Sequence, residues 1–161
     1  MSLVELTKKE ESLYSDVIEL YEGKTKSSNG LSLSEVYSEY KIIHQKYAEY
    51  SAEDIEFLKR GLFIQWYALS EPNYLTGISE LDENNERKII INLKNRIDKN
   101  QADNELLWML NYYLEWDYVF DRFKNIAEFK KDNDVFDLRN VKMKMINRGQ
   151  MGIYWNSIIE K

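Results

Sequence analysis

The longest hydrophobic pattern in the chain runs from residue 103 to residue 130. A helical period of about 3.6 residues gathers most of its apolar side chains onto one broad arc, wider than a surface helix requires. Asp103 precedes the pattern and can cap a first turn, while Lys130 and Lys131 follow it, where positive charge offsets the helix dipole. We therefore predict one long, mostly buried helix over about residues 103–130, with the other helices packed around it.

Shorter amphipathic patterns predict further helices before and after this segment. Gly23 and Pro72 mark ends of helices, and Ser51 with Asp54 resembles a capping box that opens one. The predicted helices cover residues 3–21, 35–50, 51–70 and 81–99, and a last one carries Val135, Leu138, Val141 and Met145. The pattern thus predicts an all-α, single-domain helical bundle of about six helices that spans residues 1–161.

The composition limits the chemistry that the chain can perform. With 161 residues, 43% hydrophobic and 31% charged, the chain fits one globular domain. No cysteine is present, which excludes disulfides and thiolate chemistry, and a single histidine excludes di-iron bundles and His-rich metal centres. No apolar run approaches the roughly 18 residues of a membrane span, and no signal-peptide pattern is visible, so we expect a cytoplasmic protein.

The net charge of −6 is unevenly distributed, because residues 1–121 are acidic and residues 122–161 are basic. An acidic surface disfavours nucleic acid, whose phosphates require clustered Lys and Arg. The basic residues of the last segment, among them Lys144 and Arg148, are expected to pair mainly with the acidic helices of the same chain. A protein partner of this chain is expected to present a basic surface.

The predicted helix at residues 35–50 is unusually rich in tyrosine. Its apolar stripe carries Tyr40 and Tyr47, with Tyr37 and His44 alongside. Two interpretations are open: the rings pack at the edge of the core, or they line a groove for a peptide or a ring-bearing ligand. His44 has no catalytic partner at a fixed spacing, which favours a structural hydrogen-bonding role.

A second candidate site is the connection after Pro72, which is more apolar than an ordinary solvated loop. Glu71, Asn73 and Tyr74 follow an aromatic helix end there, so an irregular backbone could present them to a ligand. The alternative is an ordinary turn between two helices.

A third candidate lies where the leucine stripe of the 103–130 segment becomes acidic, at Asp117 and Asp121. The ordinary interpretation is that the helix emerges into water there and that its acids pair with Lys124. The alternative is a divalent-metal or small-ligand site, which would suit a metal-dependent hydrolase.

No phosphate loop, nucleophile elbow or zinc-protease motif occurs in the sequence. The absence of such motifs favours binding over catalysis, and no cofactor is predicted. Small helical adaptors, inhibitors and immunity-type proteins share this general character, which is an analogy of type only. We expect protein–protein binding without catalysis, and the apolar tail at residues 149–161 is expected to dock on its own core or to form a homodimer.

Overall fold

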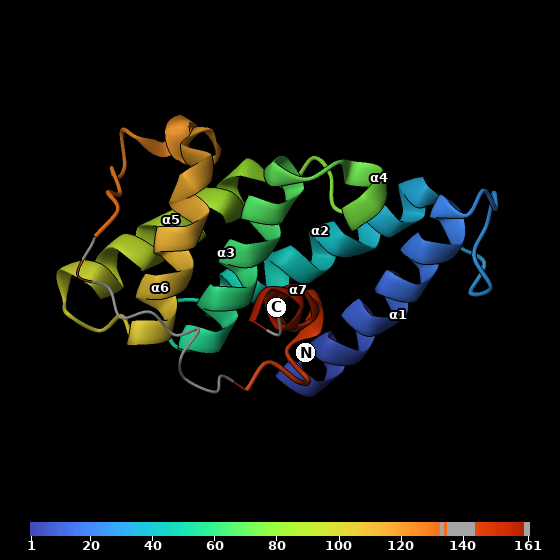
Figure 1. Ribbon diagram of the computed structural model, residues 1–161, viewed down its shortest axis with the longest axis horizontal. Coiled ribbons are helices and arrows are strands. Elements are labelled where there is room, and N and C mark those ends of the chain that lie inside the picture. The colour runs from blue at the N-terminus through green and yellow to red at the C-terminus, as the bar shows by residue number, and fades with distance from the viewer. Residues whose placement is uncertain (133, 135–143, 160–161) are drawn as a thin grey trace.

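The computed structural model describes residues 1–132, 134 and 144–159, and within these ranges the chain is helical with no β-strand (Figure 1). The elements are α1 (Leu3–Tyr21), α2 (Leu33–Tyr50), α3 (Ile55–Ser70), α4 (Asn73–Thr76), α5 (Glu83–Asp98), α6 (Asn104–Tyr113), the 3-10 helix η1 (Leu114–Phe123) and α7 (Gly149–Ile159). This arrangement confirms the all-α, single-domain bundle. Most of the helix expected around Val135 falls on residues 135–143, outside the described residues.

The helices begin at residues whose side chains satisfy the free amides of the first turn. Ser2 and Ser32 form capping boxes with Glu5 and Glu35. The capping box expected at Ser51 is wrong: Asp54 caps α3, and Ser51 is instead the buried C-cap residue of α2. Ser51 Oγ donates to the carbonyl of Ala48, so the hydroxyl serves the preceding helix.

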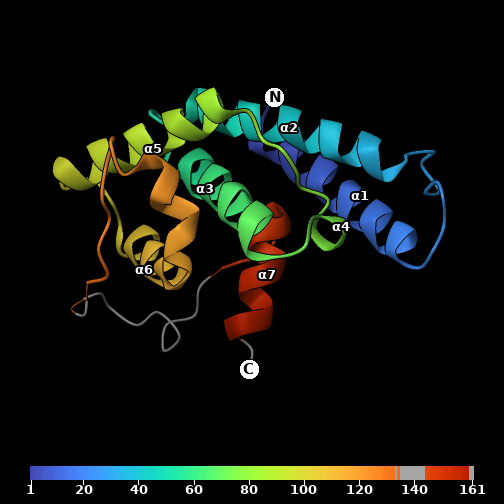
Figure 2. The same ribbon diagram turned by 90° about the horizontal axis from the view of Figure 1, so that it is seen from above.

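The most deeply buried helix is α3, which lies between α2, α5 and α7 (Figure 2). Both of its sides are apolar in sequence, as a helix with neighbours on two sides requires. Gly61 permits the tightest of these contacts, because a Cβ there would lie 2.2 Å from Ile89 Cδ1 of α5 and 3.2 Å from Tyr47 Cβ of α2. The close crossing therefore involves α5 and α2 rather than the 103–130 segment.

The prediction of one continuous helix over residues 103–130 is wrong. α6 ends at Tyr113, and Trp116 interrupts η1 with non-helical backbone angles, φ −107° and ψ 64°. The bend brings the Trp116 ring to 5.2 Å from the Trp66 ring and lets Val119, Phe120 and Phe123 turn into the core. The free energy gained by burying these side chains outweighs the local preference for a continuous helix. A periodic sequence pattern does not show where the chain bends.

The C-terminal helix α7 docks on the same chain against α1 and α3. Trp155 and Met151 are fully buried, and Trp155 Nε1 donates to Tyr113 Oη at 3.1 Å. This confirms docking of the tail on its own core and leaves the homodimer untested. Among the described residues, no helix is long and apolar enough to cross a membrane.

Candidate functional site

The tyrosine stripe of α2 belongs to the core. Tyr40, His44 and Tyr47 are completely buried, and Tyr37 is partly buried. Tyr40 Oη donates to Gln150 Oε1 at 2.5 Å, and Tyr47 Oη donates to Glu10 Oε2 at 2.6 Å. The stripe is therefore not the exposed contact surface considered from the sequence, because α7 and α1 cover it.

Glu10 is the centre of this buried polar cluster. Its carboxylate lies beneath the first turn of α7, where the backbone amide of Gln150 donates to Oε1 at 3.4 Å. Burial raises the pKa of Glu10 to about 7, although Tyr47, Arg60 and the Gln150 amide all favour the charged form. The residue was missed because it stands in the charged run Lys8–Glu11, yet it lies on the same helix stripe as Leu6 and Leu13, which was the available signal.

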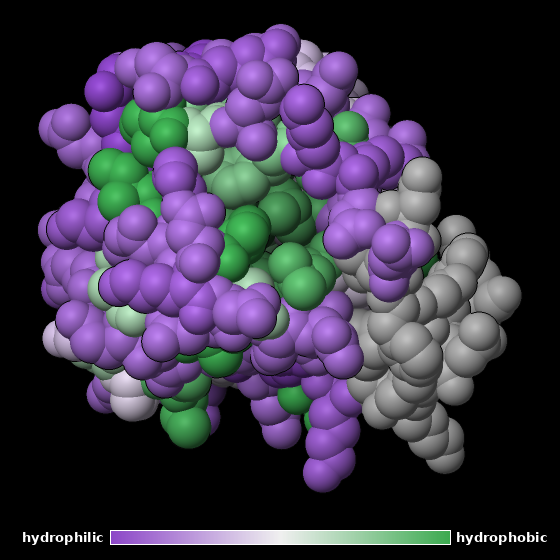
Figure 3. Space-filling view, turned by 90° about the vertical axis from the view of Figure 1, so that its left-hand side faces the viewer, coloured by the Kyte–Doolittle hydropathy of each residue, from purple (hydrophilic) through white to green (hydrophobic). Residues whose placement is uncertain are grey.

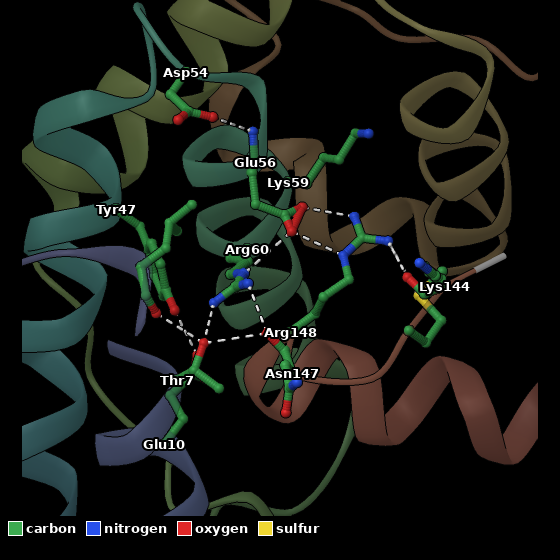
Figure 4. Close-up of polar contacts among 12 residues, drawn as sticks. Thr7, Glu10, Tyr47, Asp54, Glu56, Lys59, Arg60, Lys144, Asn147 and Arg148 are labelled. Atoms are coloured by element: carbon green, nitrogen blue, oxygen red, sulfur yellow. Dashed lines mark hydrogen bonds and ion pairs between the residues drawn. The ribbon is translucent and has the colours of Figure 1, made fainter. Parts of the chain in front are cut away.

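A second polar cluster joins α3, α6 and the residue before α7, and Figure 4 shows its pair of Glu56 and Arg148. The Arg148 guanidinium donates to both oxygens of Glu56, at 2.8 and 2.6 Å, and to Glu105 at 2.5 Å. Lys59, which is buried, donates to Asp103 at 2.7 Å and to Glu105 at 2.9 Å. The expected intramolecular pairing of the basic segment is thus confirmed for Arg148. The charged side chains of this cluster link α3 to α6 and to the residue before α7.

Arg60 completes the clusters drawn in Figure 4. Its guanidinium donates to Thr7 Oγ1 at 2.8 Å and to the carbonyl of Asn147 at 3.1 Å, which ties α1 and α3 to the segment before α7. A cavity of about 310 Å³ lies beside this contact, lined by Leu3, Val4 and Lys8 among others. Arg60 and Thr7, which line it, are engaged in the structural bonds just described.

His44 is placed as a structural residue. Its Nε2 lies 3.0 Å from Gln65 Oε1, and burial lowers its pKa to about 4. The imidazole is therefore neutral at neutral pH, and no carboxylate or hydroxyl among the described residues hydrogen-bonds to it. This geometry lacks the partner that a general base requires.

Asp117 and Asp121 do lie along one cavity of about 140 Å³, together with Glu128 and Lys124. Lys124 Nζ is 3.1 Å from Asp121 Oδ1, which confirms that ordinary surface pair. No group of three or more His, Cys, Asp or Glu suited to a metal ion occurs in the part of the chain that the structure describes. The geometry therefore adds no support to a metal centre at these aspartates.

Glu71, Asn73 and Tyr74 are all exposed, at the end of α3 and on the short α4. Asn73 holds the turn, with its side-chain amide 3.0 Å from Ser79 Oγ. Gly77 ends α4 with φ 76°, and a Cβ at this position would lie 2.6 Å from Val17 and 2.9 Å from Val36. The connection is thus a defined turn that only glycine fits, so α4 is held in a fixed position.

Tyr74 lies against Tyr21 at the end of α1, with ring centroids 6.3 Å apart and ring planes 6° apart. The two rings are 53% and 64% exposed, so the pair stands mostly in water. Near the end of α3, Tyr118 of η1 donates to the carbonyl of Leu69 at 3.1 Å, and both side chains are exposed. We call these residues the helix-end surface: Tyr21, Leu69, Glu71, Tyr74 and Tyr118.

The electrostatics of this surface are negative. α1 and α3 both end there without a basic residue in the last turn, and their C-cap residues are Glu22 and Glu71. The free carbonyls at the ends of helices carry partial negative charge, which these carboxylates reinforce. The surface therefore offers apolar rings beside negative charge.

A different side of the molecule, formed around α5, α6 and the segment after η1, presents apolar side chains within a polar surround (Figure 3). A groove of about 190 Å³ lies there, lined by Ile97, Leu107, Leu110, Leu114 and Phe129 among others. Nothing in the described residues indicates which molecule would cover it.

Comparison of the chain with protein-family models, with curated proteins and with solved structures finds no match.

Proposed function

We propose that this protein binds another protein, one with a basic surface, through the helix-end surface. The observation that carries the proposal is the stacked and exposed ring pair of Tyr21 and Tyr74. The binding role needs no catalytic group, which agrees with the structural use of His44, Glu10 and Arg60 described above.

Exposed aromatic rings favour association because tyrosine provides a large contact area at a low entropic cost. The ring pair is also pre-organised, since Tyr74 is fixed by the Gly77 turn and by its stack on Tyr21. Less conformational entropy is lost on binding when the side chains are already ordered.

The charge of the surface supports the chemistry of the partner. Glu22 and Glu71 stand at the negative ends of α1 and α3, so lysine or arginine on a partner would be attracted there. Electrostatic attraction of this kind mainly increases the rate of association and the choice of partner. The partner is therefore expected to be basic, and its association is expected to slow at high salt.

The proposal is tested by affinity capture from a lysate of the source organism, with quantitative mass spectrometry. The wild type is compared with the double variant Tyr21→Ala and Tyr74→Ala and with Glu71→Gln. The matched control is Tyr50→Ala, because Tyr50 is also exposed and also packs on another ring, that of Phe57, on a different surface. Circular dichroism melting establishes that each variant is folded.

We expect a near-stoichiometric basic protein that is retained by wild type and Tyr50→Ala, lost from the double variant, and bound with a weaker salt dependence by Glu71→Gln. Equal retention by the double variant and the control would place the binding surface elsewhere. If no protein is retained by the wild type, protein binding as the function is contradicted.

A further inference from the structure

A cleft of about 170 Å³ opens on another side of α1, separate from the helix-end surface. Its walls come from Lys9, Ser12, Leu13 and Asp16 of α1, Asn29 and Leu31 of the following turn, and Glu39 of α2. Asp16 and Tyr21 are five residues apart, which separates their directions by about 140° around a helix. The cleft therefore faces away from the helix-end surface and is independent of binding there.

Asp16 is the unusual residue of this cleft. Its side chain is 1% exposed, although it carries a carboxylate. Oδ1 accepts a hydrogen bond from Asn29 Nδ2 at 3.0 Å, but the buried Oδ2 has no hydrogen-bond partner among the described residues. A buried polar atom without a partner is destabilising, and more so when it is charged.

The nearest cation of the cleft does not satisfy Asp16. Lys9 Nζ lies 3.5 Å from Glu39 Oε2 at the rim, where both side chains are exposed. Within the described residues, no Lys, Arg or His forms an ion pair with Asp16. The carboxylate therefore lacks a positive partner that its burial calls for.

Asn29 marks the position that such a partner would take. Its Nδ2 donates both to Asp16 Oδ1 and to Ser12 Oγ, at 3.0 and 3.2 Å, and so places one nitrogen between two acceptors of α1. Asn29 itself is exposed, on a turn before Gly30, so its amide covers the carboxylate from the solvent side. A ligand nitrogen in this place would displace the amide and meet the same two acceptors, Asp16 Oδ1 and Ser12 Oγ.

We propose that this cleft binds a primary alkylammonium group, whose nitrogen replaces Asn29 Nδ2 between Asp16 and Ser12. An ammonium can donate to both Asp16 Oδ1 and Ser12 Oγ, and unlike the neutral amide it brings the positive charge that the buried carboxylate lacks. Leu13 and Leu31 provide apolar walls for the methylene chain, as a lysine side chain or a small aliphatic amine requires. A metal ion fits less well, because no cluster of three or more carboxylate, His or Cys side chains is found among the residues described.

The test titrates n-butylammonium chloride into the whole protein and follows binding by two-dimensional amide NMR, with sodium chloride and 1-butanol as controls for ionic strength and for apolar binding. We expect saturable shifts at Asn29, Leu31 and Ser12 with the amine and none with either control. Asp16→Asn should weaken binding at least tenfold, since it removes the charge and keeps the shape. Glu11→Gln is the matched control, because Glu11 is an exposed carboxylate on the same helix.

Asn29→Ala gives a result of the opposite sign, which loss of folding cannot produce. Removing the amide that competes for the same position should tighten amine binding several-fold. This variant keeps the proposal testable even if Asp16→Asn fails to fold.

Titration with Nα-acetyl-lysine-N-methylamide distinguishes the two sources of the ammonium group. Binding of both probes supports a lysine side chain of a polypeptide, and binding of n-butylammonium alone supports a free aliphatic amine. If neither probe binds, or if a folded Asp16→Asn binds as well as the wild type, the proposal is overturned.

Discussion

Two pairs of tyrosines in this molecule have the same chemistry and opposite environments. Tyr40 and Tyr47 of α2 are completely buried, with hydroxyls that donate to Gln150 and Glu10. Tyr21 and Tyr74 stack on each other with more than half of each ring in water. The difference shows that the number of tyrosines on a helix stripe says little about binding, because the elements that later cover the stripe decide whether it is surface or core.

The covering element for the buried pair is α7. Its first turn supplies Gln150. The side-chain oxygen of Gln150 accepts a hydrogen bond from Tyr40, and its backbone N–H donates to Glu10. The turn fits closely, because Gly149 has φ 65° and a Cβ there would lie 2.1 Å from Glu10 Oε2. Residues 149–150 and Glu10 are far apart in sequence, so no local pattern around residues 35–50 could reveal this cover.

The largest expected effect comes from truncating a buried tyrosine. Tyr47→Ala should lower the free energy of unfolding by about 3–5 kcal/mol, because it leaves a cavity and removes the donor to Glu10. Urea unfolding followed by circular dichroism measures the loss, with Tyr50→Ala as the exposed control from the same helix. A stable, fully folded Tyr47→Ala would contradict the placement of this ring in the core.

A smaller loss is expected from Gly149→Ala, which disturbs the cover rather than the ring. A left-handed backbone costs a non-glycine residue about 1–3 kcal/mol, and contact of the new Cβ with Glu10 adds to this cost. A double-mutant cycle with Glu10→Ala in urea unfolding isolates the second contribution. If the two changes are additive, Gly149 does not press on the Glu10 carboxylate.

Two titratable groups buried beside these tyrosines, Glu10 and His44, make the free energy of unfolding depend on pH. Burial raises the pKa of Glu10 from 4.5 to about 7, so between these values only the folded chain keeps the proton, and stability falls as pH rises. Burial lowers the pKa of His44 from 6.5 to about 4, so between these values only the unfolded chain binds the proton, and stability falls as pH drops. The two effects oppose each other from pH 4.5 to 6.5.

Glu10→Gln should remove the contribution of Glu10 to the pH dependence and leave that of His44. Its free energy of unfolding should then fall as pH drops from 6.5 to 4.5, by up to about 1.4 kcal/mol per pH unit more than in the wild type. Urea unfolding at a series of pH values measures the difference, and Glu11→Gln, an exposed neighbour, should behave as the wild type. Parallel pH profiles for Glu10→Gln and wild type would show that Glu10 is ionised in the folded state at these pH values.

The smallest effect on stability is expected for the exposed pair. Tyr21→Ala or Tyr74→Ala should change the free energy of unfolding by less than about 1 kcal/mol, because each ring already faces water. Thermal melting checks this, with Tyr47→Ala as the buried counterpart. A loss as large as that of Tyr47→Ala would mean that the ring pair supports the fold and would weaken its assignment to binding.

Sequence patterns predicted the bounds of a helix well where the helix has a single apolar face that packs on the core. The bounds of α1 match the predicted range 3–21, and α5, at Glu83–Asp98, lies within two residues of the predicted range 81–99, because apolar stripes are local properties of the chain. The patterns failed from residue 114 to residue 130, where the pattern continued but the chain forms a 3-10 helix, bends at Trp116 and is no longer helical after Phe123. The change from leucine to aspartate along that stripe was the local sign of the bend, and it indicated only an emergence into water.

The candidate residues divide in the same way. Glu71, Asn73 and Tyr74 were singled out because an apolar connection follows Pro72, and the structure leaves them exposed. Asp16 was not singled out, because an acidic residue in an amphipathic helix normally faces water. The turn that carries Asn29 and Leu31, far from Asp16 in sequence, lies against it in the fold.

The sequence by itself therefore determined the helical class, the approximate bounds of most helices and the negative charge of the front of the chain, because spacing and charge act over a few residues. The tertiary structure decided which tyrosines are buried, where the 103–130 segment bends, and which carboxylates lose their contact with water. These properties depend on contacts between residues far apart in the chain, such as Glu10 with Gln150 and Arg148 with Glu56, and no local pattern encodes them.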